Sequence, residues 1–136
     1  MIPGGHAETT ENPVEAVLRE AYEETSLSPQ LISFLHKKFQ KTDSEWLLPP
    51  EYFFEQRIPA HKEKGEHFHL DCAYVAIAHD DMIRHREEES NDIRWFTEDE
   101  VENETSMFLS TQKIAQELFG KLKSGNLKDV ATFIRK

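Results

Sequence analysis

One segment, ENPVEAVLREAYEETSL at residues 11–27, constrains the fold of this chain more than any other. Asn12 is a favourable N-cap, Pro13 suits the first helical position, and Glu15, three residues after the cap, completes a capping-box pattern. Apolar side chains then recur at helical spacing, at Val14, Val17, Leu18 and Ala21. We therefore predict a helix over residues 13–25 with one buried stripe.

Three acidic residues, Glu20, Glu23 and Glu24, lie within two turns of this helix, beside the apolar stripe. Like charges at this spacing repel each other, so we expect a positively charged group to bind these carboxylates. A hard divalent cation such as Mg²⁺ prefers a few carboxylate oxygens and fills its other positions with water and phosphate oxygens. Arg19 is four residues from both Glu15 and Glu23, and we expect it to pair with one of them.

Two glycines precede the helix in the segment PGGH, residues 3–6. Glycine lets the backbone approach a ligand without a side chain in the way, and we expect Glu11 to close this loop against the helix start. The alternative is an acidic surface helix in which Arg19 is only a salt-bridge partner.

The segment from Gly5 to Leu27 resembles the signature box of the Nudix hydrolases, G-x5-E-x7-R-E-U-x-E-E-x-G-U, where U is bulky and aliphatic. The pattern is met at Gly5, Glu11, Arg19, Glu20, Glu23, Glu24 and Leu27. Ala21 is small for a U position, and Ser26 replaces the last glycine. The resemblance implies an α/β fold, an α/β/α sandwich with a mixed sheet. It also implies metal-dependent hydrolysis of a pyrophosphate bond in a nucleoside diphosphate linked to another group.

The resemblance also implies roles for the box residues. Glu20, Glu23 and Glu24, together with Gly5, would bind Mg²⁺ or Mn²⁺; Arg19 would belong to the catalytic set, and Glu11 would support the loop and helix. The general base stays open between a box glutamate and a later carboxylate, Glu88 or Glu89.

The rest of the chain alternates strand and helix patterns. We predict strands at residues 31–40, 51–60, 66–78 and 91–97, a helical turn at 97–103, and an amphipathic helix at 106–125 ended by Gly125. The strand at 66–78 is apolar enough to be buried. The length, 136 residues, suits one layered domain over the whole chain with a sheet covered on both sides.

Net charge, cysteine content and hydropathy indicate which partners and which location this chain can have. The formal net charge of −10 opposes binding to a nucleic acid polymer or an anionic membrane, whereas a cation held by carboxylates would allow a small phosphorylated nucleotide-type substrate. Cys72 is the only cysteine and lies in an apolar run, which suggests a buried thiol. With no apolar stretch long enough to span a bilayer, we expect a cytoplasmic protein.

His67, His69 and Asp71 alternate along one predicted strand, so they share a face of the sheet. They are metal-ligand types, but a polar strand end is the simpler interpretation, and the resemblance favours substrate contact over a second metal site. Lys37 could likewise reach a substrate phosphate or only balance surface charge.

Chains with this box usually carry strands before it, and here only MIPGGH precedes the loop. We expect the first strands to be missing, because the true start lies upstream, because a partner lends a strand, or because the sheet is open. An open edge favours a homo-oligomer. Three other functions stay open: a non-catalytic Nudix-like module that binds a nucleotide or a protein, an isoprenoid diphosphate isomerase of related fold, and an acidic interaction domain.

Overall fold

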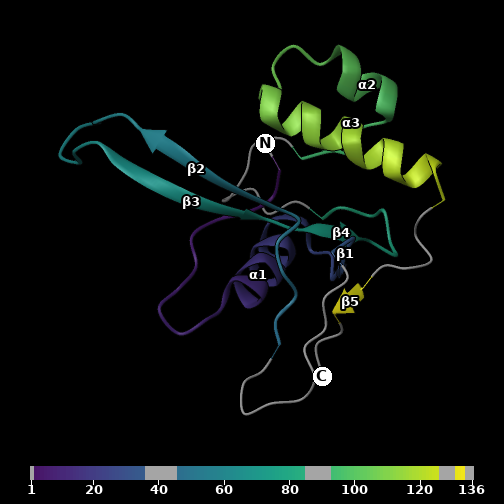
Figure 1. The fold of residues 1–136 in the computed structure, drawn as a ribbon, viewed down its shortest axis with the longest axis horizontal. Helices are drawn as coiled ribbons and strands as arrows, with labels where there is room; N and C mark the ends of the chain where they lie inside the picture. The colour runs from purple at the N-terminus through teal and green to yellow at the C-terminus, as the bar shows by residue number, and fades with distance from the viewer. Residues whose placement is uncertain (1, 36–45, 85–92, 126–130, 134–136) are drawn as a thin grey trace. The chain divides into compact units, whose positions relative to one another are not determined.

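The computed structural model describes residues 2–35, 46–84, 93–125 and 131–133. The elements in chain order are α1 (Pro13–Thr25), β1 (Gln30–Ser33), β2 (Tyr52–Ile58), β3 (His67–Ala73), β4 (Val75–Ile77), α2 (Glu98–Asn103), α3 (Leu109–Lys123) and β5 (Ala131–Phe133) (Figure 1). The chain divides into two compact units. The helical unit comprises residues 1–29 and 78–130, and the strand unit comprises residues 30–77 and 131–136. The α/β class is confirmed, while a single domain over the whole chain stays a prediction.

The first helix, α1, has the predicted bounds and the predicted cap. The side-chain oxygen of Asn12 accepts hydrogen bonds from the backbone N–H groups of Val14 and Glu15, at 3.0 and 3.1 Å. The Glu15 carboxylate in turn accepts from the N–H of Asn12 at 3.0 Å, which completes a capping box. Val14 and Ala16 are buried, and Val17, Leu18 and Ala21 are half-buried, so the apolar stripe faces the interior.

The end of α1 falls at Ser26, whose backbone is left-handed, with φ 59° and ψ 16°. Its N–H donates to the carbonyl of Tyr22 at 2.8 Å, and its hydroxyl donates to the carbonyl of Arg84 at 3.0 Å. The N–H of Arg84 returns a bond to the carbonyl of Thr25 at 3.1 Å. A serine thus adopts the turn that glycine would enter more cheaply, and it gains a hydrogen bond that glycine lacks.

The helices α2 and α3 follow one another and pack together. Thr97 caps α2 in a second capping box with Glu100, and Lys123 of α3 pairs with Glu98 of α2 at 2.7 Å. The helix α3 begins at Leu109 and not at residue 106, because both the N–H and the hydroxyl of Ser106 donate to Glu104, an alternative to helical bonding. None of the described helices is long and apolar enough to cross a bilayer.

Residues 93–96, predicted as strand, have no strand partner in the described chain. The Arg94 guanidinium pairs with Glu100 at 2.9 Å and lies 3.8 Å from the centre of the Phe96 ring. The indole N–H of Trp95 donates to the carbonyl of Asp81 at 2.8 Å. Its side chains thus bond to α2 and to the main chain at Asp81 instead of belonging to a described sheet.

The strand unit contains two sheets. One has the order β4-β1-β5, with β1 antiparallel to both neighbours. Leu31 and Ile32 of β1 are buried, as is Leu48. The Glu51 carboxylate accepts from the Ser33 hydroxyl and from the Phe34 N–H, at 3.2 and 3.0 Å, so it fixes the chain where β1 ends.

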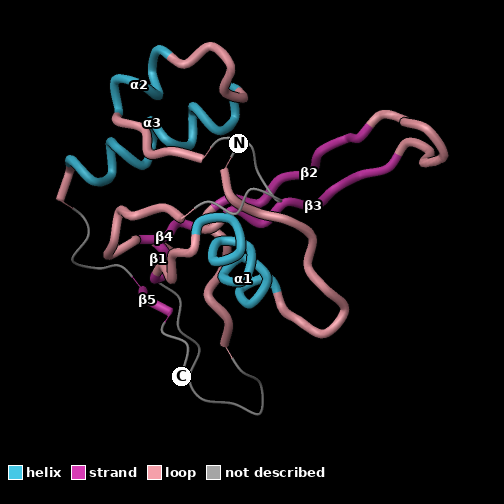
Figure 2. Tube along the Cα trace, turned by 180° about the vertical axis from the view of Figure 1, so that it is seen from behind, coloured by secondary structure: helices cyan, strands magenta, loops and turns pink. Residues whose placement is uncertain are grey.

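The second sheet is the two-stranded ribbon of β2 and β3, paired from Tyr52 with Ala73 to Ile58 with His67 (Figure 2). The prediction of one long buried strand at 66–78 was wrong. The strand is interrupted at Tyr74. Phe68 and Leu70 are 56% and 65% exposed, because a neighbouring strand pairs only with the edge of β3, and a face is buried only where another layer packs on it. All described pairings are antiparallel, so they include none of the parallel pairs of a mixed sheet.

Candidate functional site

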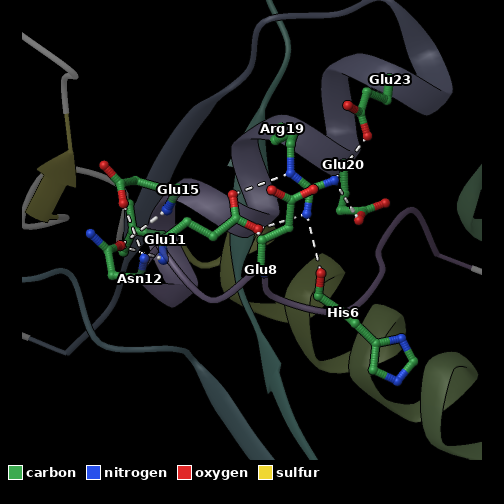
Figure 3. A network of polar contacts seen from close by, with 9 residues as sticks. His6, Glu8, Glu11, Asn12, Glu15, Arg19, Glu20 and Glu23 are labelled. Atoms are coloured by element: carbon green, nitrogen blue, oxygen red, sulfur yellow. Dashed lines mark hydrogen bonds and ion pairs between the residues drawn. The ribbon is translucent and has the colours of Figure 1, made fainter.

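Arg19 is the centre of a polar cluster in the helical unit (Figure 3). Its Nη1 atom donates to the carboxylates of Glu20 and Glu23, at 2.8 and 2.9 Å. Its Nε and Nη2 atoms donate to the two carboxylate oxygens of Glu11, at 3.2 and 2.7 Å. One guanidinium therefore gathers three of the predicted site carboxylates.

The loop before α1 is fixed through the same arginine. Arg19 Nη2 donates to the main-chain carbonyl of His6 at 3.1 Å, while the His6 ring turns away from the cluster (Figure 3). Glu11 also accepts from the N–H of Glu8 at 2.9 Å. The expected closure of the loop by Glu11 is thus present, and Arg19 is the group through which it acts. The role of the His6 carbonyl was not predicted, since a backbone acceptor leaves no signal in the sequence.

The predicted pairing of Arg19 is resolved in favour of Glu23. Glu15, the other residue at the same spacing, is occupied by its capping bond to Asn12. Glu24 lies on the next position of α1 and is half-buried. The helix therefore separates its acids into Glu15, which caps the helix, and Glu20 and Glu23, which bond to Arg19.

Gly5 lies directly against Glu20. A Cβ atom built on Gly5 would overlap the Glu20 carboxylate, whereas one built on Gly4 would meet nothing within 4 Å. A side chain at residue 5 would displace the Glu20 carboxylate, which is the far end of a flexible side chain, from its present position. The box glycine thus allows a close approach of the loop to this carboxylate.

The hydrogen bonds between Arg19 and Glu11 favour the charged forms of both groups. Hydrogen bonds from Arg19, and then from the Glu8 N–H, hold the pKa of the Glu11 carboxyl below its ordinary value of 4.5. The bonds to Glu11 and then to Glu20 raise the pKa of Arg19 still further above its ordinary range. Both partners are therefore ionised at neutral pH.

The chemistry of these donors fits a hard divalent cation, which takes oxygen ligands and above all carboxylates. In this structure the carboxylates of Glu11, Glu20 and Glu23 are nevertheless paired with the Arg19 guanidinium. Within the part of the chain that the structure describes, no three His, Cys, Asp or Glu residues are grouped so as to hold a metal ion. The cluster thus contains carboxylates of the kind that bind a metal ion, and the Arg19 guanidinium is the cation that they bind here.

The other candidate residues lie elsewhere. His67, His69 and Asp71 belong to β3 and share one face, as predicted; the two imidazole rings are 5.1 Å apart between centroids. The His67 ring also contacts the Gly65 carbonyl at 2.9 Å. The absence of a three-ligand group among the described residues removes support for a second metal site there. Lys37, Glu88 and Glu89 lie outside the described residues.

Cys72, expected as a buried thiol, is half-buried in β3. Desolvation, with a smaller contribution from the charge of Asp71, raises the pKa of its thiol. A raised pKa keeps the thiolate population small, so the residue is a poor nucleophile at neutral pH.

Comparison with known proteins agrees with this geometry. The family model described as NUDIX domain matches residues 1–118, which include the whole cluster. Searches of curated proteins and of solved structures returned no match. Since the family model matches most of the chain, the chain belongs to the Nudix family.

Proposed function

We propose that this chain is a metal-dependent pyrophosphohydrolase that cleaves a nucleoside diphosphate linked to another group by attack of water. Family membership supports hydrolysis of pyrophosphate bonds in general. The observation that carries the finer proposal is the arrangement at Arg19, which joins Glu11, Glu20 and Glu23 in one bonded cluster. A surface helix without a function has no need to gather like charges in this way.

The residues that would hold Mg²⁺ or Mn²⁺ are Glu20, Glu23 and Glu24, with the main-chain carbonyl of Gly5. Their oxygen donors fit such an ion, and the space beside Gly5 admits the Glu20 carboxylate. When bound, the cation would neutralise and orient the pyrophosphate and lower the pKa of a water.

The protein's own residues would do the remaining work. Arg19 would hold the carboxylates of Glu20 and Glu23 in fixed rotamers, as outer-shell partners of metal ligands do. Glu11 ties the loop of Gly5 to the helix. A base must take the proton of the attacking water, and we propose a box glutamate, Glu88 or Glu89 for this role.

The substrate is proposed to be a small nucleotide-type molecule. His67, His69 and Asp71 are candidates for substrate contact, since their common face would offer several polar groups to one ligand, and Lys37 is a candidate for a phosphate. The net charge of −10 supports a small ligand over a polyanion. The single cysteine and the absence of a long apolar run support a cytoplasmic location.

The test is hydrolysis of a panel of nucleoside triphosphates, nucleotide sugars, ADP-ribose, dinucleoside polyphosphates and NADH, with Mg²⁺ or Mn²⁺, by wild type and by Glu23→Gln. A matched control is Glu117→Gln, because Glu117 also lies on a helix and pairs with a cation four residues away, Lys121. We expect turnover that needs the metal, falls about 100-fold or more in Glu23→Gln, and is unchanged in Glu117→Gln.

Two different results would contradict this proposal, one for catalysis and one for the assigned site. A folded protein that is stabilised by Mn²⁺ and a nucleotide but releases no product would support the non-catalytic binding module instead. Equal turnover by Glu23→Gln and wild type would contradict the assigned site.

A further inference from the structure

Trp95 is a large aromatic side chain of the helical unit that the proposed hydrolysis does not use. It is 53% exposed, and its indole N–H donates to the main-chain carbonyl of Asp81 at 2.8 Å. An N–H group donates in the plane of its ring, so this bond fixes one edge of the indole and uses neither of its faces. Trp95 thus combines a fixed edge with a large exposed area, a combination that suits tryptophan to binding surfaces.

The carbonyl that holds Trp95 belongs to a tight turn. The Asp81 carbonyl also accepts from the N–H of Ile83 at 3.0 Å, and the Asp80 carboxylate accepts from the N–H of Met82 at 2.9 Å. The atom that anchors the indole is therefore itself held in place. Met82 is 59% exposed at this turn, and a thioether is a polarisable group that contacts aromatic rings favourably.

The same turn leads to the end of α1, the helix that carries the proposed metal ligands. The N–H of Arg84 donates to the Thr25 carbonyl at 3.1 Å. Thr25 directly follows Glu24 and lies two residues after Glu23. Trp95, the turn and α1 all belong to the helical unit, so the indole and the proposed metal ligands are connected within one compact body.

The hydrogen bonds limit the distance between the indole and the end of the helix. Trp95 Nε1 is bonded to the Asp81 carbonyl, which is bonded to the N–H of Ile83. The next N–H along the chain, that of Arg84, is bonded to the Thr25 carbonyl. These three bonds are 2.8, 3.0 and 3.1 Å long, and one residue spans about 3.8 Å at most, so Trp95 Nε1 lies within about 13 Å of the Thr25 carbonyl. The base and the second phosphate of an extended nucleoside diphosphate are separated by a distance of this order.

We propose that the indole face of Trp95 stacks on the nucleobase of the substrate, while the diphosphate group reaches the proposed metal ligands of α1. This inference rests on the proposed function and adds the residue that contacts the base. Every base has a π-face, so stacking on an aromatic ring accepts them all. Trp95 would therefore favour nucleotides over phosphate compounds without a base, and it would not select one base among the others.

The fluorescence of Trp95 tests this contact without any turnover. The chain has two tryptophans, and Trp46→Phe leaves Trp95 as the only one. A base that stacks on an indole quenches its emission, whereas pyrophosphate has no ring to stack. With Mg²⁺ present, ADP and UDP should therefore quench the emission of Trp46→Phe, and inorganic pyrophosphate should not. Emission that ADP and UDP leave unchanged, or that pyrophosphate quenches equally, would overturn stacking on Trp95.

Substitutions of Trp95 separate stacking from structural support. Trp95→Ala removes both the aromatic face and the bond to Asp81, whereas Trp95→Phe removes the bond alone. We expect the dissociation constant of ADP, measured by calorimetry with Mg²⁺, to rise about 10–100-fold in Trp95→Ala and at most a few-fold in Trp95→Phe. The control Phe53→Ala removes a ring that is 63% exposed in the strand unit, and it should bind ADP as wild type does. Equal weakening in Trp95→Phe and Trp95→Ala would assign the effect to the bond with Asp81 and overturn the proposal.

Steady-state kinetics distinguishes failure of this inference from failure of the proposed function. On a nucleotide that wild type hydrolyses, Trp95→Ala should raise KM and leave kcat unchanged, because a contact made equally in the ground state and the transition state changes binding alone. An active enzyme whose KM is the same in wild type and in Trp95→Ala would overturn stacking and leave the hydrolase assignment intact. A protein that binds ADP through Trp95 but hydrolyses no member of the panel would support stacking and contradict the proposed function.

Discussion

The guanidinium of Arg19 binds the carboxylate of Glu11 through two parallel hydrogen bonds, at 3.2 and 2.7 Å. Arg19 lies in the second turn of α1, and Glu11 precedes the helix. The pair therefore fixes the loop against the helix that carries the other acids. The planar fork of arginine matches a carboxylate in this way, and an ammonium group does not.

Replacing Arg19 by lysine should test this geometry. One ammonium cannot serve both oxygens of Glu11, the carboxylates of Glu20 and Glu23, and the His6 carbonyl together. We expect Arg19→Lys to lose about 10–100-fold in kcat/KM or in Mn²⁺ affinity, as outer-shell changes at metal sites do. Steady-state kinetics and titration with Mn²⁺ would measure this. The control Arg57→Lys alters an exposed single ion pair and should have no effect; full activity of Arg19→Lys would contradict the role of the fork.

The two neighbouring glycines provide a matched pair of variants. In Gly5→Ala the new methyl group would overlap the Glu20 carboxylate, whereas in Gly4→Ala it would lie in open space. Displacement of a reacting group by about 1 Å can reduce turnover by about 100-fold, so we expect a loss of that order for Gly5→Ala alone. Turnover of both variants decides the matter, and an equal effect at the two positions would argue against a contact specific to residue 5.

Acid should weaken the loop through Glu11. Its pKa is held below 4.5 in the folded chain, mainly by Arg19. A lowered folded pKa means that the group stabilises the fold above its unfolded pKa, and that this stabilisation is lost as the pH falls through the folded pKa. Glu11→Gln should therefore be less stable than wild type at neutral pH, and the difference should shrink below pH 4.5.

Urea unfolding of both proteins across this pH range would measure the free energy of unfolding directly. A constant difference between wild type and Glu11→Gln down to the most acidic point would rule out the ionised carboxylate as its source.

Ser26 allows backbone strain and a hydrogen bond to be separated. Ser26→Ala keeps the left-handed backbone and loses the bond to the Arg84 carbonyl, so we expect a loss of about 1 kcal/mol. Ser26→Gly loses the same bond but enters the turn more cheaply by about 1 kcal/mol, which leaves it close to wild type. Chemical denaturation should thus rank glycine above alanine, and equal stability of the two variants would show that the strain is negligible.

Local chemistry explains which elements could be predicted. The start of α1 followed from Asn12, Pro13 and Glu15, because a cap and its box act within a few residues. Gly125, with φ 73°, likewise closes α3 next to its predicted end. The spacing of the box acids predicted which of them lie close together, and Arg19 is paired with Glu11, Glu20 and Glu23; their roles in metal binding and catalysis stay a prediction.

Sheet pairing was not predictable in the same way, because it depends on residues far apart in the chain. β1 is bonded to both β4 and β5, and nothing local to Leu31 identifies these neighbours. The apolar run that contains Phe68 and Leu70 has the composition of a buried strand, yet burial needs a cover that composition does not specify. Trp95, which looks like a core residue by type, is 53% exposed because its indole bonds to the Asp81 carbonyl at the surface.

The left-handed turn at Ser26 also bears on how this motif can vary among relatives. What the position demands is a backbone conformation, and a hydroxyl that bonds to a neighbouring carbonyl offsets part of its cost in a residue other than glycine. Codons for glycine and serine differ by a single base, so this exchange is within reach of one mutation. Asparagine should be admissible for the same reason, and a β-branched residue should not. A search that insists on glycine at this position would therefore pass over chains whose helix ends in the same way.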